Sequence, residues 1–184
     1  GKRLPRADKT SLRNSRLVGI ILRLRQNWCC DTTTLCLQKY KYMKENIILE
    51  VKQKLGNKIL DFFEKNKKRY YIEIDKKDIV ECAKILFDDL GFRFQTASGV
   101  DCEKNFEILY HFSYDKTGQI VSLRVKLDKE KPEIESLTKV FKAAEWIERE
   151  IWELLGINFV GHPNLKHLLL SDDWPQGNYP LREK

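Results

Sequence analysis

The stretch that decides the fold is FEILYHFSYDKTGQIVSLRVKL, residues 106–127. Apolar and polar residues alternate along 106–114 and again along 119–127, which is the pattern of strands with one buried face. The residues between these two runs end with Gly118, and glycine readily takes the left-handed conformation of a tight hairpin turn. The stretch therefore predicts an antiparallel β-hairpin made of the two clearest strands in the chain.

The first regular element predicted upstream of the hairpin is a long helix. It is expected over 43–65, because its apolar residues fall three and four positions apart. These apolar residues are Ile47, Ile48, Val51, Leu55, Ile59, Phe62 and Phe63. A short strand is expected next, over 70–74.

A second helix and a second strand are expected between 75 and the hairpin. Asp75 can cap the amino end of the helix, and Gly91 is placed as the residue that ends it. The strand is expected over 92–97. The composition of residues 98–101, Ser-Gly-Val-Asp, predicts a loop.

Downstream of the hairpin, a last helix is expected over 142–155 and ends at Gly156. From 157 to 184 the chain holds three prolines and two glycines, which prevent any long regular element. Aromatic side chains in this segment, such as Trp174 and Tyr179, are expected to lie against the domain itself or against a partner.

Together these elements predict an α/β (α+β) fold. The expected architecture is a small mixed sheet with helices on one face, in the order αβαβββα, followed by an extended irregular C-terminal tail. The domain is expected over 43–156, and the partner-binding tail over 157–184.

The positive charge of the chain is concentrated at its beginning. The chain has 34 basic and 27 acidic residues, a net charge of +7. Residues 1–42 hold ten of the basic and two of the acidic residues, so the remainder carries −1. This aperiodic basic segment is predicted to be disordered. Three interpretations stay open: a non-native or upstream-translated extension before Met43, an organellar transit peptide, or a basic arm that binds nucleic acid.

The motifs of several functional classes are missing from the sequence. The five cysteines form no C-x-x-C pair, so no zinc or iron–sulfur site is predicted. No apolar run approaches the roughly 18 residues of a transmembrane helix. Neither a glycine-rich phosphate loop nor G-x-S-x-G is present. The residues by themselves predict a non-catalytic domain with a partner-binding tail.

Two groups of polar residues near the end of the chain have both a functional and a structural interpretation. Glu148, Arg149 and Glu150 could serve acid–base chemistry or ion pairing, but their spacing favours a solvated face with an i, i+4 pair from Glu145 to Arg149. His162 lacks partner ligands for a metal and is expected to hydrogen-bond locally in a turn.

A further turn is expected around residues 172–174. There Asp172 and Asp173 are placed to accept backbone N–H groups, and Trp174 is placed as an anchor.

The sequence of 143–182, AAEWIEREIWELLGINFVGHPNLKHLLLSDDWPQGNYPLR, resembles the 30 kDa (C-type) subunit of respiratory complex I and its relatives in energy-converting nickel–iron hydrogenases. The matching features are E-R-E on a helix, G-I, G-H-P-x-L, a short apolar run, D-D-W and a closing P-L-R. Departures are Glu153 in place of aspartate, Leu155 in place of phenylalanine, and Lys166 with His167 in place of an arginine pair.

The resemblance implies a subunit without cofactors or catalytic residues, in the peripheral arm of a membrane-bound redox complex. Its partners would be the hydrogenase-like large (49 kDa-type) subunit and the iron–sulfur small subunit, with iron–sulfur clusters and, in the hydrogenase branch, nickel–iron held by those partners. It would lie on the cytoplasmic side of the membrane, or on the matrix side of the inner mitochondrial membrane if 1–42 is a transit peptide. The residues expected to bind a partner or fix loops are Glu148, Arg149, Glu150, Gly156, Gly161, His162, Pro163, Asp172, Asp173, Trp174, Pro180, Leu181 and Arg182. The alternative function is a nucleic-acid-binding module that uses the basic arm.

Overall fold

The structure is a computed structural model in which residues 38–39 and 47–182 are described. The chain divides into two units, Gly1–Met43 and Lys44–Lys184, and the domain lies in the second unit. The predicted disordered segment over 1–42 lies outside the described residues except for 38 and 39.

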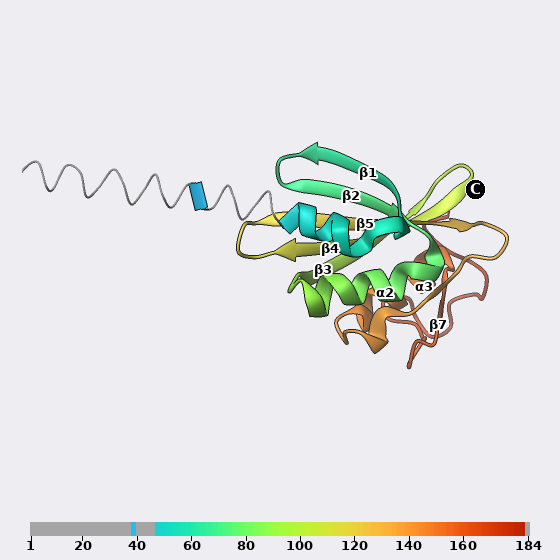
Figure 1. Cartoon of the computed structure of the whole chain (residues 1–184). Coiled ribbons are helices and arrows are strands. Elements are labelled where there is room, and N and C mark those ends of the chain that lie inside the picture. Colours follow the sequence, from blue (N-terminus) through green and yellow to red (C-terminus); the bar gives the residue numbers. More distant parts are fainter. Residues whose placement is uncertain (1–37, 40–46, 183–184) are drawn as a thin grey trace, which may run out of the picture. The chain divides into compact units, whose positions relative to one another are not determined.

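A five-stranded sheet in the order β1-β2-β5-β4-β3 forms the centre of the domain (Figure 1). Neighbouring strands are antiparallel except β2 and β5, which are parallel. The mixed sheet confirms the predicted α/β class. The strands are β1 (Ile59–Asn66), β2 (Arg69–Ile74), β3 (Arg93–Asp101), β4 (Asn105–Tyr114) and β5 (Gln119–Asp128).

The predicted hairpin is confirmed as β4 and β5, paired from Phe106 opposite Leu127 to Tyr114 opposite Gln119. Gly118 in its turn has a φ of 67°, the left-handed value that favours glycine. Every second side chain of both strands is buried, and those between are mostly half-buried or exposed. The hairpin therefore supplies the middle of the hydrophobic core.

Helical residues 47–55 and helix α2 (Ile79–Lys84) pack on this buried face of the sheet (Figure 1). A wider helical turn, Ile85–Asp89, continues α2, and Gly91 follows with a φ of 68°. Asp75 precedes a short turn into α2 and accepts a hydrogen bond from the N–H of the second following residue at 2.9 Å. The predicted cap and the predicted helix stop are both confirmed.

The prediction of one helix over 43–65 is wrong in its second half. The helical residues end at 55, Gly56 takes a φ of 51°, and the chain turns into β1. Ile59 and Phe62, which fit a helical period, instead lie on an edge strand opposite β2. A short apolar run fits both the helical and the strand period, and here the antiparallel pairing with β2 makes the run a strand.

The predicted loop over 98–101 is also wrong, because these residues complete β3. The ladder continues from Ser98 opposite Leu109 to Asp101 opposite Phe106. Pairing with a long neighbouring strand outweighs a local composition typical of loops. The observed order is helix, β1, β2, α2, β3, β4, β5, β6, α3 and β7, and it differs from the predicted order.

A second sheet of two parallel strands, β6 (Glu133–Glu135) and β7 (Asn158–Val160), flanks helix α3 (Ala144–Leu155). Strands of three residues are too short for a periodic signal, so the sequence analysis missed them. The irregular segment therefore begins after β7, and not at 157 as predicted. From 161 to 182 the described residues form turns and bends without a helix or strand.

Helix α3 packs closely on β3 because residue 99 has no side chain. A Cβ atom at Gly99 would lie 2.5 Å from Leu155 Cδ1 and 3.1 Å from Ile151 Cγ2. Leu155 is itself buried, so its side chain has little room to move aside.

We expect Gly99→Ala to lower the free energy of unfolding by about 1–3 kcal/mol, because the added methyl group overpacks the α3–β3 contact. Thermal melting by circular dichroism would measure this loss. The matched control is Val100→Thr, a nearly isosteric change at an exposed neighbour, which should melt like the original chain. Equal melting temperatures for all three chains would contradict the close-approach argument.

Candidate partner-binding site

Helix α3 buries charged residues on two of its sides. The exposed fractions are 0% for Glu148, 8% for Arg149 and 2% for Glu153. The prediction that Glu148 and Arg149 lie on a solvated polar face is therefore wrong. The predicted ion pair between Glu145 and Arg149 is not found among the contacts of the described residues. A buried charge is costly unless hydrogen bonds compensate it, so the partners of these groups define the site.

Glu148 fixes the turn that follows β6. Its carboxylate accepts hydrogen bonds from Ser136 Oγ at 2.5 Å and from the N–H of Leu137 at 2.7 Å. Burial raises the pKa of Glu148 to about 7, although these two hydrogen bonds act in the opposite direction. The phenol of Tyr110 on β4 is also near this carboxylate, whose charge adds to burial in raising the pKa of the tyrosine.

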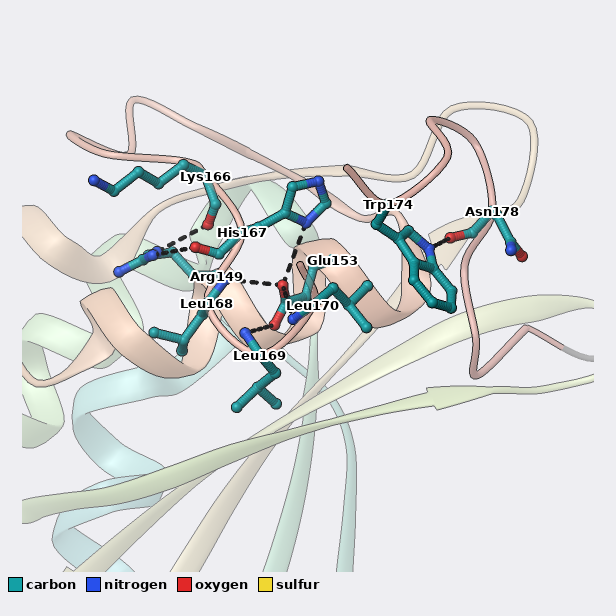
Figure 2. Close-up of polar contacts among 9 residues, drawn as sticks. All are labelled: Arg149, Glu153, Lys166, His167, Leu168, Leu169, Leu170, Trp174 and Asn178. Carbon is teal, nitrogen blue, oxygen red and sulfur yellow. Dashed lines mark hydrogen bonds and ion pairs between the residues drawn. The ribbon is translucent and has the colours of Figure 1, made fainter. Parts of the chain in front are cut away.

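Arg149 binds the backbone of the C-terminal segment (Figure 2). Its Nε donates to the carbonyl of Lys166 at 3.0 Å, and its Nη2 donates to the carbonyl of His167 at 2.5 Å. The guanidinium thus holds two consecutive carbonyl groups. The side chains of Lys166 and His167 are not needed for this contact, because only their carbonyl groups accept hydrogen bonds from Arg149.

Glu153 accepts hydrogen bonds from the backbone N–H groups of the three residues that follow His167. The distances are 2.9 Å to Leu168, 2.8 Å to Leu169 and 3.3 Å to Leu170, and His167 Nδ1 lies 3.4 Å away (Figure 2). Burial by itself would raise the pKa of Glu153, but these donors outweigh it and leave the pKa below its usual value. Arg149 and Glu153, one helical turn apart, together bind five consecutive residues of irregular backbone.

Local hydrogen bonds fix the two turns on either side of this contact. His162 Nδ1 accepts from the N–H of Asn164 at 3.1 Å, so its Nε2 carries the hydrogen and donates to the carbonyl of Glu145 at 3.0 Å. Trp174 Nε1 donates to the carbonyl of Asn178 at 2.8 Å. His162 has the local role that the sequence predicted, and it also ties the segment to the start of α3.

The last described residue, Arg182, closes the segment on the carboxyl end of α3. Its Nε donates to the carbonyl of Leu155 at 2.7 Å, and its guanidinium lies 4.4 Å from the ring centre of Tyr179. Gly156 ends the helix with a φ of 71°, and a Cβ there would lie 2.5 Å from the Tyr179 ring. A cation is favourable at this position, because the last carbonyl groups of a helix carry partial negative charge.

The remaining predicted residues lie on the surface. Glu150 is half-buried and forms no hydrogen bond or ion pair with any described residue. Asp173 is exposed, and hydrogen bonds from Ser171 and from its own backbone hold its pKa below the usual value. The exposed residues of the predicted set, apart from Asp173, are Gly161, Pro163, Asp172, Pro180 and Leu181.

Large apolar side chains are exposed on α3 and on the segment that it holds. The exposed fractions are 66% for Trp146, 63% for Leu169 and 57% for Leu181. Trp146 and Leu169 line one hollow of about 420 Å³, and Leu181 lines a second of about 220 Å³. Single exposed apolar residues need no explanation, but a set gathered around two hollows marks an interaction surface.

The described residues 47–182 contain no group of three or more His, Cys, Asp or Glu side chains that could hold a metal ion. Within the same part of the chain, none of the helices has the length and apolar character that a membrane span requires.

The fold is shared with a component of a respiratory membrane assembly. The architecture matches a chain in the structure of the membrane-bound sulfane sulfur reductase, an archaeal respiratory membrane complex, with a TM-score of 0.66 over 75% of this chain and 82% of that chain. The two sequences are 21% identical, so this likeness concerns the fold alone.

Comparison of the sequence with known families and proteins identifies the family of this chain. The family described as respiratory-chain NADH dehydrogenase, 30 kDa subunit, matches residues 72–184. The C-type subunit of NADH-quinone oxidoreductase from Citrifermentans bemidjiense is 31% identical over 77% of this chain and 89% of its own length. The C-type subunit of F420H2 dehydrogenase from Methanosarcina mazei is 41% identical over 62% of this chain and 73% of its own length. The chain belongs to the 30 kDa subunit family of respiratory-chain NADH dehydrogenase, that is, to the C-type subunits of NADH-quinone oxidoreductase-type complexes.

This membership confirms the resemblance seen in the sequence of 143–182. Glu153 is the main residue that the sequence analysis missed, because a fourth glutamate on a charged helix carries no signal of burial. Trp146 and Leu169 were missed because their exposure depends on how the segment folds back.

We expect Glu153→Gln to loosen residues 168–170, because an amide has one acceptor oxygen and its NH₂ group would face a backbone donor. Hydrogen–deuterium exchange of these amides should quicken at least tenfold, which corresponds to a loss of about 1.4 kcal/mol of local stability. Glu150→Gln is the matched control, because Glu150 lies on the same helix without a hydrogen-bond partner among the described residues. Unchanged exchange in Glu153→Gln would refute the role of this carboxylate.

The raised pKa of Glu148 predicts a pH-dependent stability. A glutamate has an ordinary pKa of 4.5, and in the folded chain the value is about 7. The folded state therefore binds the Glu148 proton more tightly than the unfolded state does. The stabilisation of the folded state that results is full below pH 4.5 and disappears as the pH rises through 7. Between about pH 5 and pH 8 the free energy of unfolding should fall by roughly 2 kcal/mol more than in Glu148→Gln.

Urea unfolding at several pH values would measure this difference. Glu150→Gln should follow the original chain across the same range. Parallel pH curves for the original chain and for Glu148→Gln would contradict the assignment to Glu148.

Proposed function

We propose that this chain is a non-catalytic structural subunit of the peripheral arm of a membrane-bound redox complex. It docks on a hydrogenase-like large subunit and keeps that subunit in register with an iron–sulfur small subunit, while electron transfer is coupled to ion translocation. The complex is of the NADH-quinone oxidoreductase type or the energy-converting hydrogenase type. The metal centres belong to the partners, and the chain lies on the cytoplasmic or matrix side of the membrane.

One observation carries the docking role: the irregular segment 161–182 is held on α3 by buried ionic groups, while Trp146, Leu169 and Leu181 remain exposed. Arg149 and Glu153 bind the segment mainly through its backbone, which fixes its position and leaves side chains such as Leu169 free. A surface that is fixed in shape and exposes several large apolar side chains fits a stable protein partner.

The names of the relatives support the same assignment. They are C-type subunits of multisubunit dehydrogenases, and the matched family covers the described domain from residue 72 onward. We propose the same domain organisation as the sequence predicts: a domain followed by a segment that contacts the partner.

The proposal predicts that the full chain, tagged and expressed in its native cells, co-purifies from membranes with a large and a small hydrogenase-like subunit. The double variant Leu169→Asp/Leu181→Asp should reduce the recovered large subunit at least tenfold, because each charge would be buried against an apolar partner surface. Both side chains are exposed, so the melting temperature of the isolated chain should stay unchanged.

Phe63→Asp is the matched control, because Phe63 is 57% exposed on β1, at the opposite edge of the sheet. It should leave the complex intact. Recovery of the original chain without redox subunits would overturn the proposal. Salt-sensitive recovery with nucleic acid instead, lost on deletion of 1–42, would support the alternative function.

A further inference from the structure

The two hollows lie between α3 and β3, adjoin each other and are together called the groove. The first is lined by Trp146, Leu168 and Leu169, and the second by Gly99, Leu154 and Leu181. Ile147 and Glu150 line both hollows, so the two meet at the middle of the helix. One wall is formed by β3, which is an edge strand of the sheet.

The groove is built before any partner arrives. Glu153 fixes the backbone of Leu168 and Leu169 on one side. On the other side, the N–H of Leu181 donates to the carbonyl of Leu154 at 3.1 Å. A binding surface that needs no ordering on association loses less conformational entropy when it binds.

Glu150 is the one ionisable side chain among the described residues that line the two hollows. Its carboxylate has no hydrogen bond or ion pair with any residue in the described range 47–182. A protein segment that covers the groove would remove water from this carboxylate, and an uncompensated buried charge is strongly unfavourable. A Lys or Arg side chain in the covering segment would compensate this charge directly.

The spacing along α3 also sets the spacing within the partner. Trp146, Glu150 and Leu154 lie four residues apart in sequence, so the first and last are separated by about 12 Å along the helix axis. An extended chain covers about 12 Å in roughly four residues, and every second side chain points to the same side. The cation would therefore stand midway between two apolar side chains.

We propose that the groove binds an extended segment of a partner subunit with the pattern apolar, any residue, Lys or Arg, any residue, apolar. The cation pairs with Glu150, one apolar side chain enters the hollow at Trp146 and Leu169, and the other enters the hollow at Leu181. This inference rests on the proposed function and adds the chemistry that the partner must present.

Photo-crosslinking in the assembled complex tests the pattern. The full chain would carry p-benzoylphenylalanine at position 146 or 181 and would be purified with its complex from native membranes, illuminated and digested. Mass spectrometry should identify one cross-linked partner segment with the proposed pattern from both positions. The same photoreactive residue at position 60, exposed on β1 at the far edge of the sheet, is the control and should not cross-link to that segment.

Charge reversal tests the ion pair. Glu150→Lys should reduce recovery of the complex at least tenfold, and changing the cation of the cross-linked segment to glutamate should restore it. Glu64→Lys, an exposed position on β1, is the matched control and should have no effect.

An intact complex in which positions 146 and 181 cross-link to nothing, to a second copy of this chain, or to a segment without the central cation would overturn this inference alone. Normal recovery with Glu150→Lys would do the same. Failure to recover any complex with the original chain would overturn the proposed function, and this inference with it.

Discussion

The arrangement of the C-terminal segment depends on one constraint: irregular backbone that lies against a domain must still satisfy its N–H and C=O groups. Arg149 and Glu153 meet this constraint from a single turn of α3. The guanidinium takes two consecutive carbonyl groups, and the carboxylate takes the three N–H groups that follow. Because five residues are bound through main-chain atoms, this part of the segment is held without any helix or strand.

Because α3 binds the segment through its main chain, the backbone is fixed in position while most side chains remain free. Apart from His167 Nδ1, which lies 3.4 Å from Glu153, the side chains between 166 and 170 take no part in these polar contacts, so apolar residues such as Leu169 can face outward. The contacts of His162 and Arg182 hold the segment near the two ends of the helix in the same way. A rigid backbone with free side chains is the condition that a pre-formed docking surface needs, and it links the packing of α3 to the proposed role of the chain.

Much of the fold could be predicted from local patterns. The β4–β5 hairpin, the second helix and the stops at Gly91 and Gly156 follow from periodicity and from the conformational freedom of glycine. The errors fall where two local interpretations compete. The run 59–65 fits both a helical and a strand period, and 98–101 has a loop composition, yet pairing with β2 and β4 makes both segments strands.

The sequence by itself determined the α/β class, the central hairpin and the family signature in 143–182, because these depend on local spacing or on the order of residues. Only the tertiary structure decided which charges of α3 are buried and which are free. Glu148, Glu150 and Glu153 are the same residue type on one helix, but the first fixes a turn, the last binds three N–H groups and the middle one lines a surface groove. Their roles differ because burial and hydrogen-bond partners come from segments that are distant in sequence, and no local pattern records those contacts.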